Sequence, residues 1–395
     1  MSIPRVVLKP GREKPVRNGH PWVFSGAIGR IEGQAADGEA IDVTDARGDF
    51  LARGLLNRRS QIVVRLFSWE AGADLTPELL HERIAAADAR RAGVLPRDTD
   101  AYRVVFSESD GLPGLIVDRY GDLLAVQCST LGMQRRKGAV VAALRALFDP
   151  AAIVERPDGE TLTREGLAAQ GGALLGAVPG EAEIAEYGLR FLVDLEGGQK
   201  TGFFLDQRDN RRRVANYCAD ARVLNCFAYT GAFAVYAAAA GAAQVINVDT
   251  SAEALRLAER QLALNGFAAA GDEYRNGDVF QVLREYRERD ERSDVIILDP
   301  PKFAHSAEQV TRATRGYKDI NLLALQLLNP GGILATFSCS GLVSADLFQK
   351  VIFGASVDAH RPAQIIERLT QAPDHPVLLS FPESEYLKGL ICRAL

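Results

Sequence analysis

The chain has 395 residues, of which 47% are hydrophobic and 25% charged, as is ordinary for a globular protein. Its formal net charge of −5 excludes a polycation, and no apolar run reaches the roughly 18 residues that a membrane-spanning helix needs. The start of the chain shows no apolar signal region, so we expect a cytoplasmic protein without membrane contacts. At about 150 residues per domain, the length predicts two or three domains.

Cysteine usage is typical of a reducing compartment. The five cysteines are scattered without any C-x-x-C spacing, at Cys128, Cys218, Cys226, Cys339 and Cys392. An odd number without a framework argues against disulfides and against a zinc site, so we expect no metal.

Charge is unevenly distributed along the chain. Residues 1–70 carry 11 Lys and Arg against 8 Asp and Glu, a net of +3, whereas residues 71–185 carry 12 against 17, a net of −5. A local positive face is what contacts with nucleic-acid phosphates require. The alternative is that an excess of three charges arises by chance.

Residues 1–70 are typical of a small β-rich domain. Four short apolar runs punctuated by glycines predict strands, at Val6–Leu8, Ala40–Val43, Phe50–Ala52 and Ile62–Leu66. Between the first two runs, basic side chains interleave with aromatic rings, at Lys9, Arg12, Lys14, Arg17, His20, Trp22 and Phe24. Cations for phosphates and rings for stacking form the usual surface for single-stranded RNA. The alternative is that the rings fill the core of a small barrel, and we expect this for Trp22.

Residues 71–185 predict a central α+β domain. A helix begins at the cap Thr76, has Pro77 in its first turn and runs to about Arg91. The elements expected after it are strands alternating with glycine turns in residues 102–130, a helix over Leu131–Phe148, a strand over Ile153–Glu155 and a linking segment from Gly171.

A predicted hairpin, Ala182–Tyr187 and Leu189–Asp194, precedes a loop at residues 197–209 that is rich in glycine, aromatic and polar side chains. Loops of this composition often cover a ligand. Phe203 and Phe204 in this loop could stack on a base or fill the core, and the sequence favours neither.

The stretch Arg222–Asp249 predicts a β-α-β unit of a parallel sheet, with a second strand that ends in Asp249. A turn at the carboxyl end of a strand is where open α/β sheets bind ligands, and an acid there accepts hydrogen bonds from ribose hydroxyls. The turn has one glycine, Gly231, where a dinucleotide fingerprint has three. This favours a cofactor with ribose and adenine but no phosphate, such as S-adenosylmethionine. The alternative is a structural unit without a ligand.

Further β-α units predict a doubly wound parallel sheet with an antiparallel edge. The expected elements are a helix over Ala252–Leu264, a strand ending at Asn276–Asp278, a strand over Val295–Asp299, a helix over Leu322–Leu328, a strand over residues 331–341 and a closing strand pair at residues 377–380 and 390–393.

Three strand ends carry acids, Asp249, Asp278 and Asp299, which a parallel sheet brings to one edge. Asp278 is a candidate for contact with an adenine amino group. A fourth strand end carries Cys339, a candidate nucleophile in a cytoplasmic enzyme. A thiolate that adds to carbon 6 of a pyrimidine makes carbon 5 nucleophilic enough to take a sulfonium methyl group. The alternative is a buried strand cysteine, but the small polar neighbours of Cys339 favour a loop.

Residues 299–301, Asp-Pro-Pro, resemble the Asp/Asn-Pro-Pro-aromatic loop of amino-directed methyltransferases. The fourth position holds Lys302 instead of an aromatic residue, and Phe303 follows. This departure argues against methylation of an adenine amino group, although Phe303 could still stack on a base.

The whole chain resembles the large-subunit ribosomal RNA cytosine-5 methyltransferases with an amino-terminal PUA domain. The motifs that carry the resemblance span nearly the whole length, at residues 19–26, 107–120, 201–210, 229–231, 299–302 and 338–340. The resemblance implies three domains: a PUA barrel over residues 1–70, a strand–strand–helix–strand–strand domain over residues 71–185 and a Rossmann-like class I methyltransferase domain over residues 186–395.

The resemblance also implies a reaction and its residues. S-adenosylmethionine is the implied donor and a cytosine of 23S ribosomal RNA, naked or in a pre-50S particle, is the implied acceptor; a homodimer is suggested. Cys339 would be the nucleophile, and Asp299 would hold the cytosine. The cofactor would be lined or covered by Phe204, Gln207, Arg208, Asn225, Phe227, Tyr229, Gly231, Asp249, Asn276, Asp278 and Asp299. The residues expected to contact RNA are Lys9, Arg12, Lys14, Arg17, His20, Lys302 and Phe303.

Two departures from related enzymes leave points open. Some cytosine-5 RNA enzymes use a second cysteine after the Asp-Pro-Pro position to release product; this chain has none there, so the proton-removing base is unassigned and Glu385 is a weak candidate. Asn225 stands where many methyltransferases have an acid. Two other functions are open: methylation of a guanine in the same RNA, and an RNA-binding assembly factor without catalysis, against which the acids and Cys339 argue.

Overall fold

The structure is a computed structural model that describes residues 4–267, 271–304 and 306–395. Residues 1–3, on which the expectation of no signal region partly depends, lie outside the described residues. No helix of the described residues is both long and apolar enough to cross a membrane. Two compact units divide the chain: the first is Met1–Tyr187, Val193–Leu205 and Pro373–Ser384, and the second is Gly188–Leu192, Asp206–Ala372 and Glu385–Leu395.

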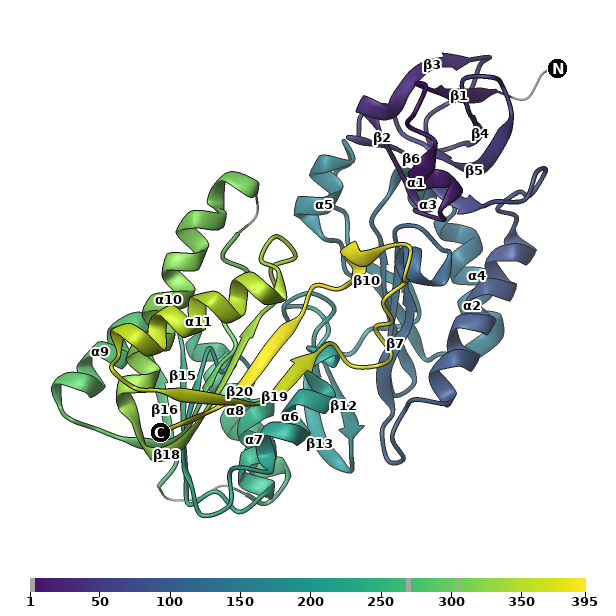
Figure 1. Ribbon diagram of the computed structural model, residues 1–395. Helices are drawn as coiled ribbons and strands as arrows, with labels where there is room; N and C mark the ends of the chain where they lie inside the picture. Colours follow the sequence, from purple (N-terminus) through teal and green to yellow (C-terminus); the bar gives the residue numbers. More distant parts are fainter. Residues whose placement is uncertain (1–3, 268–270, 305) are drawn as a thin grey trace. The chain divides into compact units, whose positions relative to one another are not determined.

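The first unit begins with a six-stranded sheet in the order β2-β6-β5-β4-β1-β3 (Figure 1). Its elements are β1 (Arg5–Leu8), α1 (Lys14–Arg17), β2 (Trp22–Phe24), β3 (Ile28–Glu32), β4 (Ala40–Thr44), β5 (Phe50–Leu56) and β6 (Ile62–Ser68). The four predicted strands are confirmed. Alternating apolar side chains, among them Val6, Ile41 and Leu66, fill the core of this sheet.

A five-stranded sheet in the order β11-β10-β9-β8-β7 follows in the same unit. Its elements are α2 (Pro77–Ala92), β7 (Ala101–Phe106), β8 (Leu115–Tyr120), β9 (Leu123–Cys128), α3 (Leu131–Arg135), α4 (Lys137–Phe148), β10 (Ala152–Glu155), α5 (Gly159–Arg164) and β11 (Gly172–Leu175). The strand–strand–helix–strand pattern is confirmed. So is the start of α2, where the Thr76 hydroxyl accepts a hydrogen bond from the Leu79 amide at 3.3 Å.

The chain then forms the predicted hairpin, β12 (Glu181–Glu186) and β13 (Leu189–Asp194), and enters a seven-stranded sheet in the order β16-β15-β14-β17-β18-β20-β19. The strands are β14 (Arg222–Cys226), β15 (Gln244–Asp249), β16 (Glu273–Asn276), β17 (Ser293–Leu298), β18 (Leu328–Ser338), β19 (Ala363–Thr370) and β20 (Lys388–Ala394). The first five are parallel, and β20 runs antiparallel to both neighbours. The predicted doubly wound sheet with an antiparallel edge is confirmed.

Helices cover both faces of this sheet (Figure 1). The helices are α6 (Arg208–Ala215), α7 (Ala232–Ala239), α8 (Ala252–Leu264), α9 (Val279–Glu288), α10 (Val310–Leu327) and α11 (Ala345–Asp358). Leu224, Ile246 and Ile296 pack with α9, α10 and α11 in one core, because side chains one residue apart on a strand face opposite sides. Asn225 and Asn247 consequently face the other side of the sheet.

Two expectations about these elements were wrong, and a third predicted a helix that is longer in the structure. The predicted helix over Leu131–Phe148 is two helices, because Arg136 leaves helical geometry and its guanidinium donates to the Gly38 carbonyl at 2.9 Å, a tertiary contact that local sequence does not encode. The helix predicted over Leu322–Leu328 is the carboxyl-terminal part of α10. Ala313, Tyr317 and Ile320 are buried on its earlier turns, but Gly316 and the charged residues among them obscure that pattern.

The expected strand over residues 377–380 is also absent. These residues belong to the first unit, and Leu379 is 99% exposed. The actual partner of β20 is β19, whose register pairs Thr370 with Lys388 and Ala363 with Ala394. Because β19 is an edge strand with largely exposed side chains, it lacks the apolar alternation by which a strand is identified in sequence.

Candidate functional site

The strand order of the large sheet reverses between β14 and β17, and the crevice outside the carboxyl ends at such a point is the usual ligand site. The residues that follow the carboxyl ends of the parallel strands therefore lie along the same edge of the sheet. β14 leads into the turn before α7, β15 ends in Asp249, β17 leads into Asp299, and β18 leads into Cys339. The convergence expected for the strand-end acids follows from this topology.

The turn after β14 is held in an unusual conformation by Asp249. The Tyr229 amide donates to Asp249 Oδ2 at 2.9 Å, and the Ser251 amide donates to Oδ1 at 2.8 Å. Phe227, Tyr229 and Gly231 have φ of 57°, 48° and 74°, in the left-handed region that non-glycine residues rarely adopt. Such strain persists where the surroundings fix the backbone, as at ligand sites. Asp249 therefore organises the turn.

Gly231 has a steric reason to be glycine. A Cβ on it would lie 2.6 Å from Cβ of Ala258 on α8. The glycine thus allows α7 and α8 to pack closely directly behind the turn. This is one of the close-packing roles that glycine has in β-α turns.

Asn225 lies beneath this turn rather than in it. Its side chain is 1% exposed, and Nδ2 donates to Asn247 Oδ1 at 2.9 Å. The pair links β14 to β15 just before their carboxyl ends. As an uncharged group, Asn225 is suited to this buried position better than a carboxylate would be.

Asn276 ends β16, Asp278 follows it, and both are exposed. Asn276 Nδ2 donates to the carbonyls of Asp249 and Thr250 at 3.2 and 2.8 Å, which ties the end of β16 to the end of β15. Asp278 caps α9, where Oδ1 accepts from the Gln281 amide at 3.1 Å. Both residues are thus beside Asp249, as the sequence predicts.

The candidate nucleophile lies on a loop anchored on both sides. Ser338 and Ser340 are fully buried, whereas Cys339 between them is partly exposed. Ser338 Oγ donates to the Tyr317 hydroxyl at 3.0 Å, and Ser340 Oγ donates to the Ala304 carbonyl at 3.2 Å. The backbone is therefore fixed on both sides while Cys339 keeps exposed surface, the arrangement expected of a nucleophile rather than of a core cysteine.

The other four cysteines differ from Cys339 in burial. They are buried, and burial raises the pKa of Cys128 and Cys218 to about 12, of Cys392 to about 11 and of Cys226 still further above its ordinary range. Thiols of this kind stay protonated and inert near pH 7. Cys339 is accordingly the one cysteine of the chain that is not buried.

Sequence analysis missed Lys388, a buried lysine at the start of β20. Its Nζ donates to the carbonyls of Ser340 and Val343, at 2.5 and 2.6 Å, in the loop that carries Cys339. Burial lowers the pKa of the Lys388 ammonium to about 8, and the charges of Cys339 and Glu385 oppose this effect. The sequence did contain a signal for this residue: a lysine within an otherwise apolar run near the end of the chain indicates a buried charge.

Tyr317 of α10 is a second residue that sequence analysis missed. Burial raises the pKa of its hydroxyl to about 12, so the hydroxyl is neutral at pH 7 and able to accept the hydrogen bond from Ser338. Its ring lies 4.7 Å from that of Phe303, centroid to centroid, and Phe280 lies 6.2 Å from Phe303 on another side. Phe303 is thus half-buried against other rings, and Lys302 before it is partly exposed.

Gln207 and Arg208 start α6 and are almost completely buried. Asn210 Nδ2 donates to Gln207 Oε1 at 2.6 Å and to the Thr370 carbonyl at 3.0 Å. Phe204 belongs to the first unit, where Lys200 Nζ lies 4.6 Å from the centre of its ring. Of the two aromatic residues in this loop, Phe203 is buried and Phe204 is half-buried.

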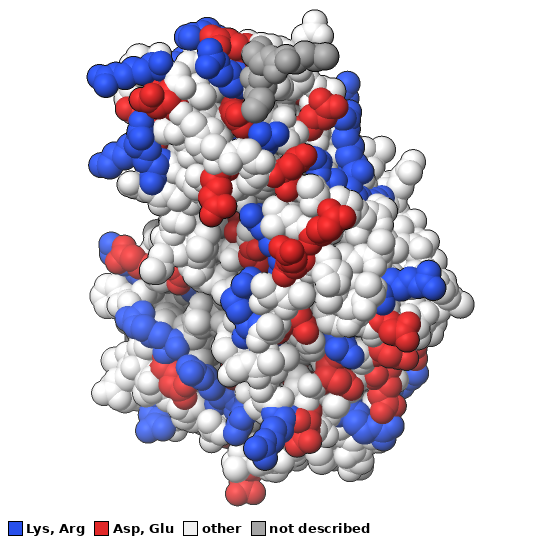
Figure 2. Space-filling view, turned by 90° about the vertical axis from the view of Figure 1, so that its right-hand side faces the viewer, with Lys and Arg blue, Asp and Glu red and all other residues white. Residues whose placement is uncertain are grey.

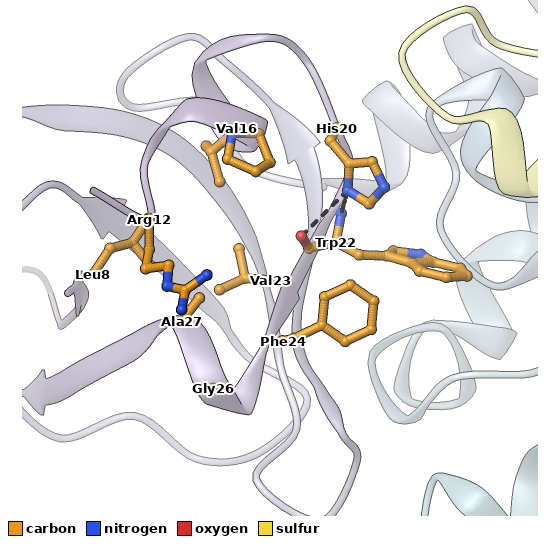
Figure 3. A pocket seen from close by; sticks show the side chains of 10 residues that line it. Leu8, Arg12, Val16, His20, Trp22, Val23, Phe24, Gly26 and Ala27 are labelled. Atoms are coloured by element: carbon orange, nitrogen blue, oxygen red, sulfur yellow. Dashed lines mark hydrogen bonds between the residues drawn. The ribbon is translucent and has the colours of Figure 1, made fainter. Parts of the chain in front are cut away.

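The first unit has a pocket of about 420 Å³ beside α1 and β2 (Figure 3). It is lined by Leu8, Arg12, Pro15, Val16, His20, Trp22, Val23, Phe24, Gly26 and Ala27. Trp22 is half-buried rather than a full core residue; its Nε1 donates to Glu108 Oε1 at 2.7 Å, and its ring stands edge-on to that of Phe24 at 6.0 Å. Phe24 is 45% exposed. The pocket therefore offers accessible aromatic surface.

The basic residues around this pocket differ in how far they are engaged. Lys9 Nζ donates to the Gly26 carbonyl at 3.0 Å, and Arg17 pairs with Asp45 at 2.8 Å. His20 Nε2 lies 3.3 Å from the Glu383 carboxylate. Within the described residues, Arg12 and Lys14 form no ion pair and are exposed. On the face in Figure 2, Lys and Arg alternate with Asp and Glu, so local clusters rather than one broad field provide positive charge.

Comparison with known proteins adds independent information. Residues 170–392 match the family of S-adenosylmethionine-dependent methyltransferases, and residues 6–69 match PUA-like domains. "Ribosomal RNA large subunit methyltransferase I" from Klebsiella pneumoniae (strain 342) is 47% identical over 395 residues, which cover 100% of this chain and 99% of that protein. The protein of the same name from Salmonella newport (strain SL254) is 47% identical over 396 residues, covering 100% and 98%.

Two solved structures are similar over almost the whole chain. SMU.776, a methyltransferase complexed with SAH, has a TM-score of 0.86 at 23% identity and covers 98% of this chain and 99% of that one. A SAM-dependent methyltransferase from Streptococcus mutans has a TM-score of 0.84 at 23% identity, with the same coverage. At this identity the similarity shows the fold alone.

Proposed function

Because the chain belongs to the family of S-adenosylmethionine-dependent large-subunit ribosomal RNA methyltransferases with a PUA-like domain, we propose that it methylates carbon 5 of a cytosine in 23S ribosomal RNA through a covalent bond to Cys339. The observation that carries the proposal is the exposure of Cys339 between two buried, hydrogen-bonded serines at the ligand edge of the sheet. The proposal includes three domains with the boundaries predicted above and a cytoplasmic location.

The residues around Asp249 fit the methyl donor. Asp249 is a carboxylate at the end of β15, suited to accept hydrogen bonds from two ribose hydroxyls, and Asp278 offers an acceptor for the adenine amino group. Phe227 and Tyr229 lie on the turn that Asp249 holds, and Gln207 and Arg208 come from α6 of the same unit. S-adenosylmethionine supplies an electrophilic methyl group there.

Cys339 supplies the chemistry that cytosine lacks. Its thiolate adds to carbon 6, so that the sulfur–carbon bond forms and the electrons of the 5,6 double bond make carbon 5 nucleophilic. Carbon 5 takes the methyl group. A base then removes the proton of carbon 5, the double bond re-forms, and the thiolate leaves. Asp299 would hold the ring nitrogen or amine of the cytosine, and Glu385, which is exposed, is a candidate for the base.

The identity of the methylated nucleoside tests this function. The chain is incubated with labelled S-adenosylmethionine and unmodified large-subunit RNA, as naked RNA and as pre-50S particles, and the RNA is digested to nucleosides. We expect the label in 5-methylcytidine. Label in a methylated guanine would overturn the cytosine assignment. Absence of both transfer and donor binding would favour an assembly factor without catalysis.

We further propose that the pocket beside α1 and β2 contacts the RNA. Phe24 and Trp22 offer ring faces or edges to an unstacked base, while Arg12 and Lys14 offer cations that no described carboxylate neutralises. Lys9, Arg17 and His20 would contact RNA at the same edge, and Lys302 and Phe303 would contact RNA beside Cys339. The PUA-like family match over residues 6–69 supports a nucleic-acid role for this unit.

Removing the two free cations is expected to weaken RNA binding in a salt-dependent way. The Arg12→Ala/Lys14→Ala variant should make the negative slope of log K against log salt shallower by about 1.4, since each phosphate contact to single-stranded RNA contributes about −0.7. Titrations at several salt concentrations measure this slope. The matched control is Arg5→Ala/Arg30→Ala, which removes two charges of the same sheet that already share Glu32. Equal slopes for both variants would contradict the proposed RNA surface.

A further inference from the structure

The cation of Lys388 is placed next to the loop of the candidate nucleophile by the antiparallel edge of the sheet. β20 pairs with β18 so that Lys388 stands opposite Ser338, the last residue before Cys339. From there the side chain extends to the loop beyond, where Nζ donates to the carbonyls of Ser340 and Val343. Lys388 therefore contacts the chain on both sides of Cys339: it pairs with Ser338 before it and donates to the carbonyls of Ser340 and Val343 after it.

A lysine in this position is costly unless it has a role. Lys388 is 9% exposed, and burial of an ammonium group disfavours its charged form. Two carbonyl oxygens satisfy two of its three protons, and they favour the cation because they only accept hydrogen bonds. With a pKa of about 8, the amine is still mostly charged at pH 7. An apolar residue would fill the same strand position without this cost.

We propose that Lys388 is a positioning residue that fixes the backbone of the Cys339 loop and stabilises the Cys339 thiolate with its positive charge. This inference rests on the proposed function, in which that thiolate attacks the base. Among the described residues, Cys339 and Glu385 act electrostatically on Lys388, and Cys339 and Asp299 act on Tyr317 of α10. The negative charge of a Cys339 thiolate favours the ammonium form of Lys388, and the same attraction favours the thiolate.

The rate at which iodoacetamide alkylates Cys339, followed by mass spectrometry across a pH series, tests the role of Lys388 without RNA or donor. The four buried cysteines react slowly, which leaves Cys339 as the reporter. In the wild-type protein we expect a midpoint below about 8.5, the pH at which an ordinary cysteine is half ionised. In Lys388→Met, which keeps the length of the side chain, the midpoint should rise by about one pH unit. Lys388→Arg should restore most of the shift.

The outcomes separate this inference from the proposed reaction. A folded Lys388→Met variant with an unchanged midpoint would mean that Lys388 only fills space, and it would overturn the inference. If that variant does not fold, the wild-type midpoint decides, because a value at or above 8.5 also overturns it. Alkylation needs no substrate, so a guanine product would remove the proposed function while leaving this result unaffected.

Discussion

Replacing Cys339 by alanine is expected to abolish methyl transfer to cytosine. Without the thiolate, carbon 5 is too weak a nucleophile, and loss of a covalent nucleophile typically costs on the order of 10⁴-fold or more. Single-turnover transfer of labelled methyl to unmodified large-subunit RNA measures the loss. Binding of S-adenosylmethionine should be unchanged, because the thiol lies after β18 and the donor site is built around Asp249 at the end of β15.

Cys218→Ala is the matched control for this variant. It makes the same chemical change at a buried cysteine after α6, whose sulfur donates to the Val214 carbonyl within that helix, and its transfer rate should remain that of the wild type. A second readout detects the bond itself: RNA carrying 5-fluorocytidine should trap a covalent complex with the wild-type chain, since fluorine cannot leave as a proton does. Transfer that survives in Cys339→Ala would assign Cys339 a structural role.

Sequence patterns predicted the catalytic half of the molecule well because its parallel strands are buried on both faces. Val223–Asp249 combines apolar strands, a single-glycine turn and a terminal acid, and each local preference agrees with the fold. The acids and the cysteine could be placed together because parallel strands share their carboxyl edge. That inference needs only the order of strands and helices along the chain and no knowledge of tertiary contacts.

The residues that sequence analysis missed act through contacts between distant segments. Lys388 reaches the Cys339 loop only because β20 returns antiparallel beside β18, 50 residues of chain after Ser338. Tyr317 lies in the part of α10 that Gly316 obscured, and it touches Ser338 only through tertiary packing. Likewise, the unusual φ of Tyr229 accompanies a hydrogen bond that its amide donates to the Asp249 carboxylate 20 residues later, which no local propensity encodes.

Asp249→Ala is expected to weaken S-adenosylmethionine binding by roughly 100-fold, because hydrogen bonds to a charged group contribute about 1.5–3 kcal/mol each. The substitution removes the proposed ribose contacts and also releases the Tyr229 amide, so the strained turn loses its anchor. Isothermal titration calorimetry measures the change in Kd, and thermal unfolding measures the accompanying loss of stability. The first quantity reports on the site, whereas the second includes the cost to the fold.

Asp294→Ala separates these two effects. Asp294 also accepts a backbone hydrogen bond, from the Arg222 amide at 2.9 Å, and one from Asn329 Nδ2 at 2.7 Å, but it lies at the start of β17, on the opposite edge of the same sheet. We expect a comparable loss of stability and an unchanged Kd for the donor. If both variants weaken binding alike, Asp249 acts only through the fold; if neither does, the donor does not bind at the end of β15. A selective loss in Asp249→Ala would place the ribose there.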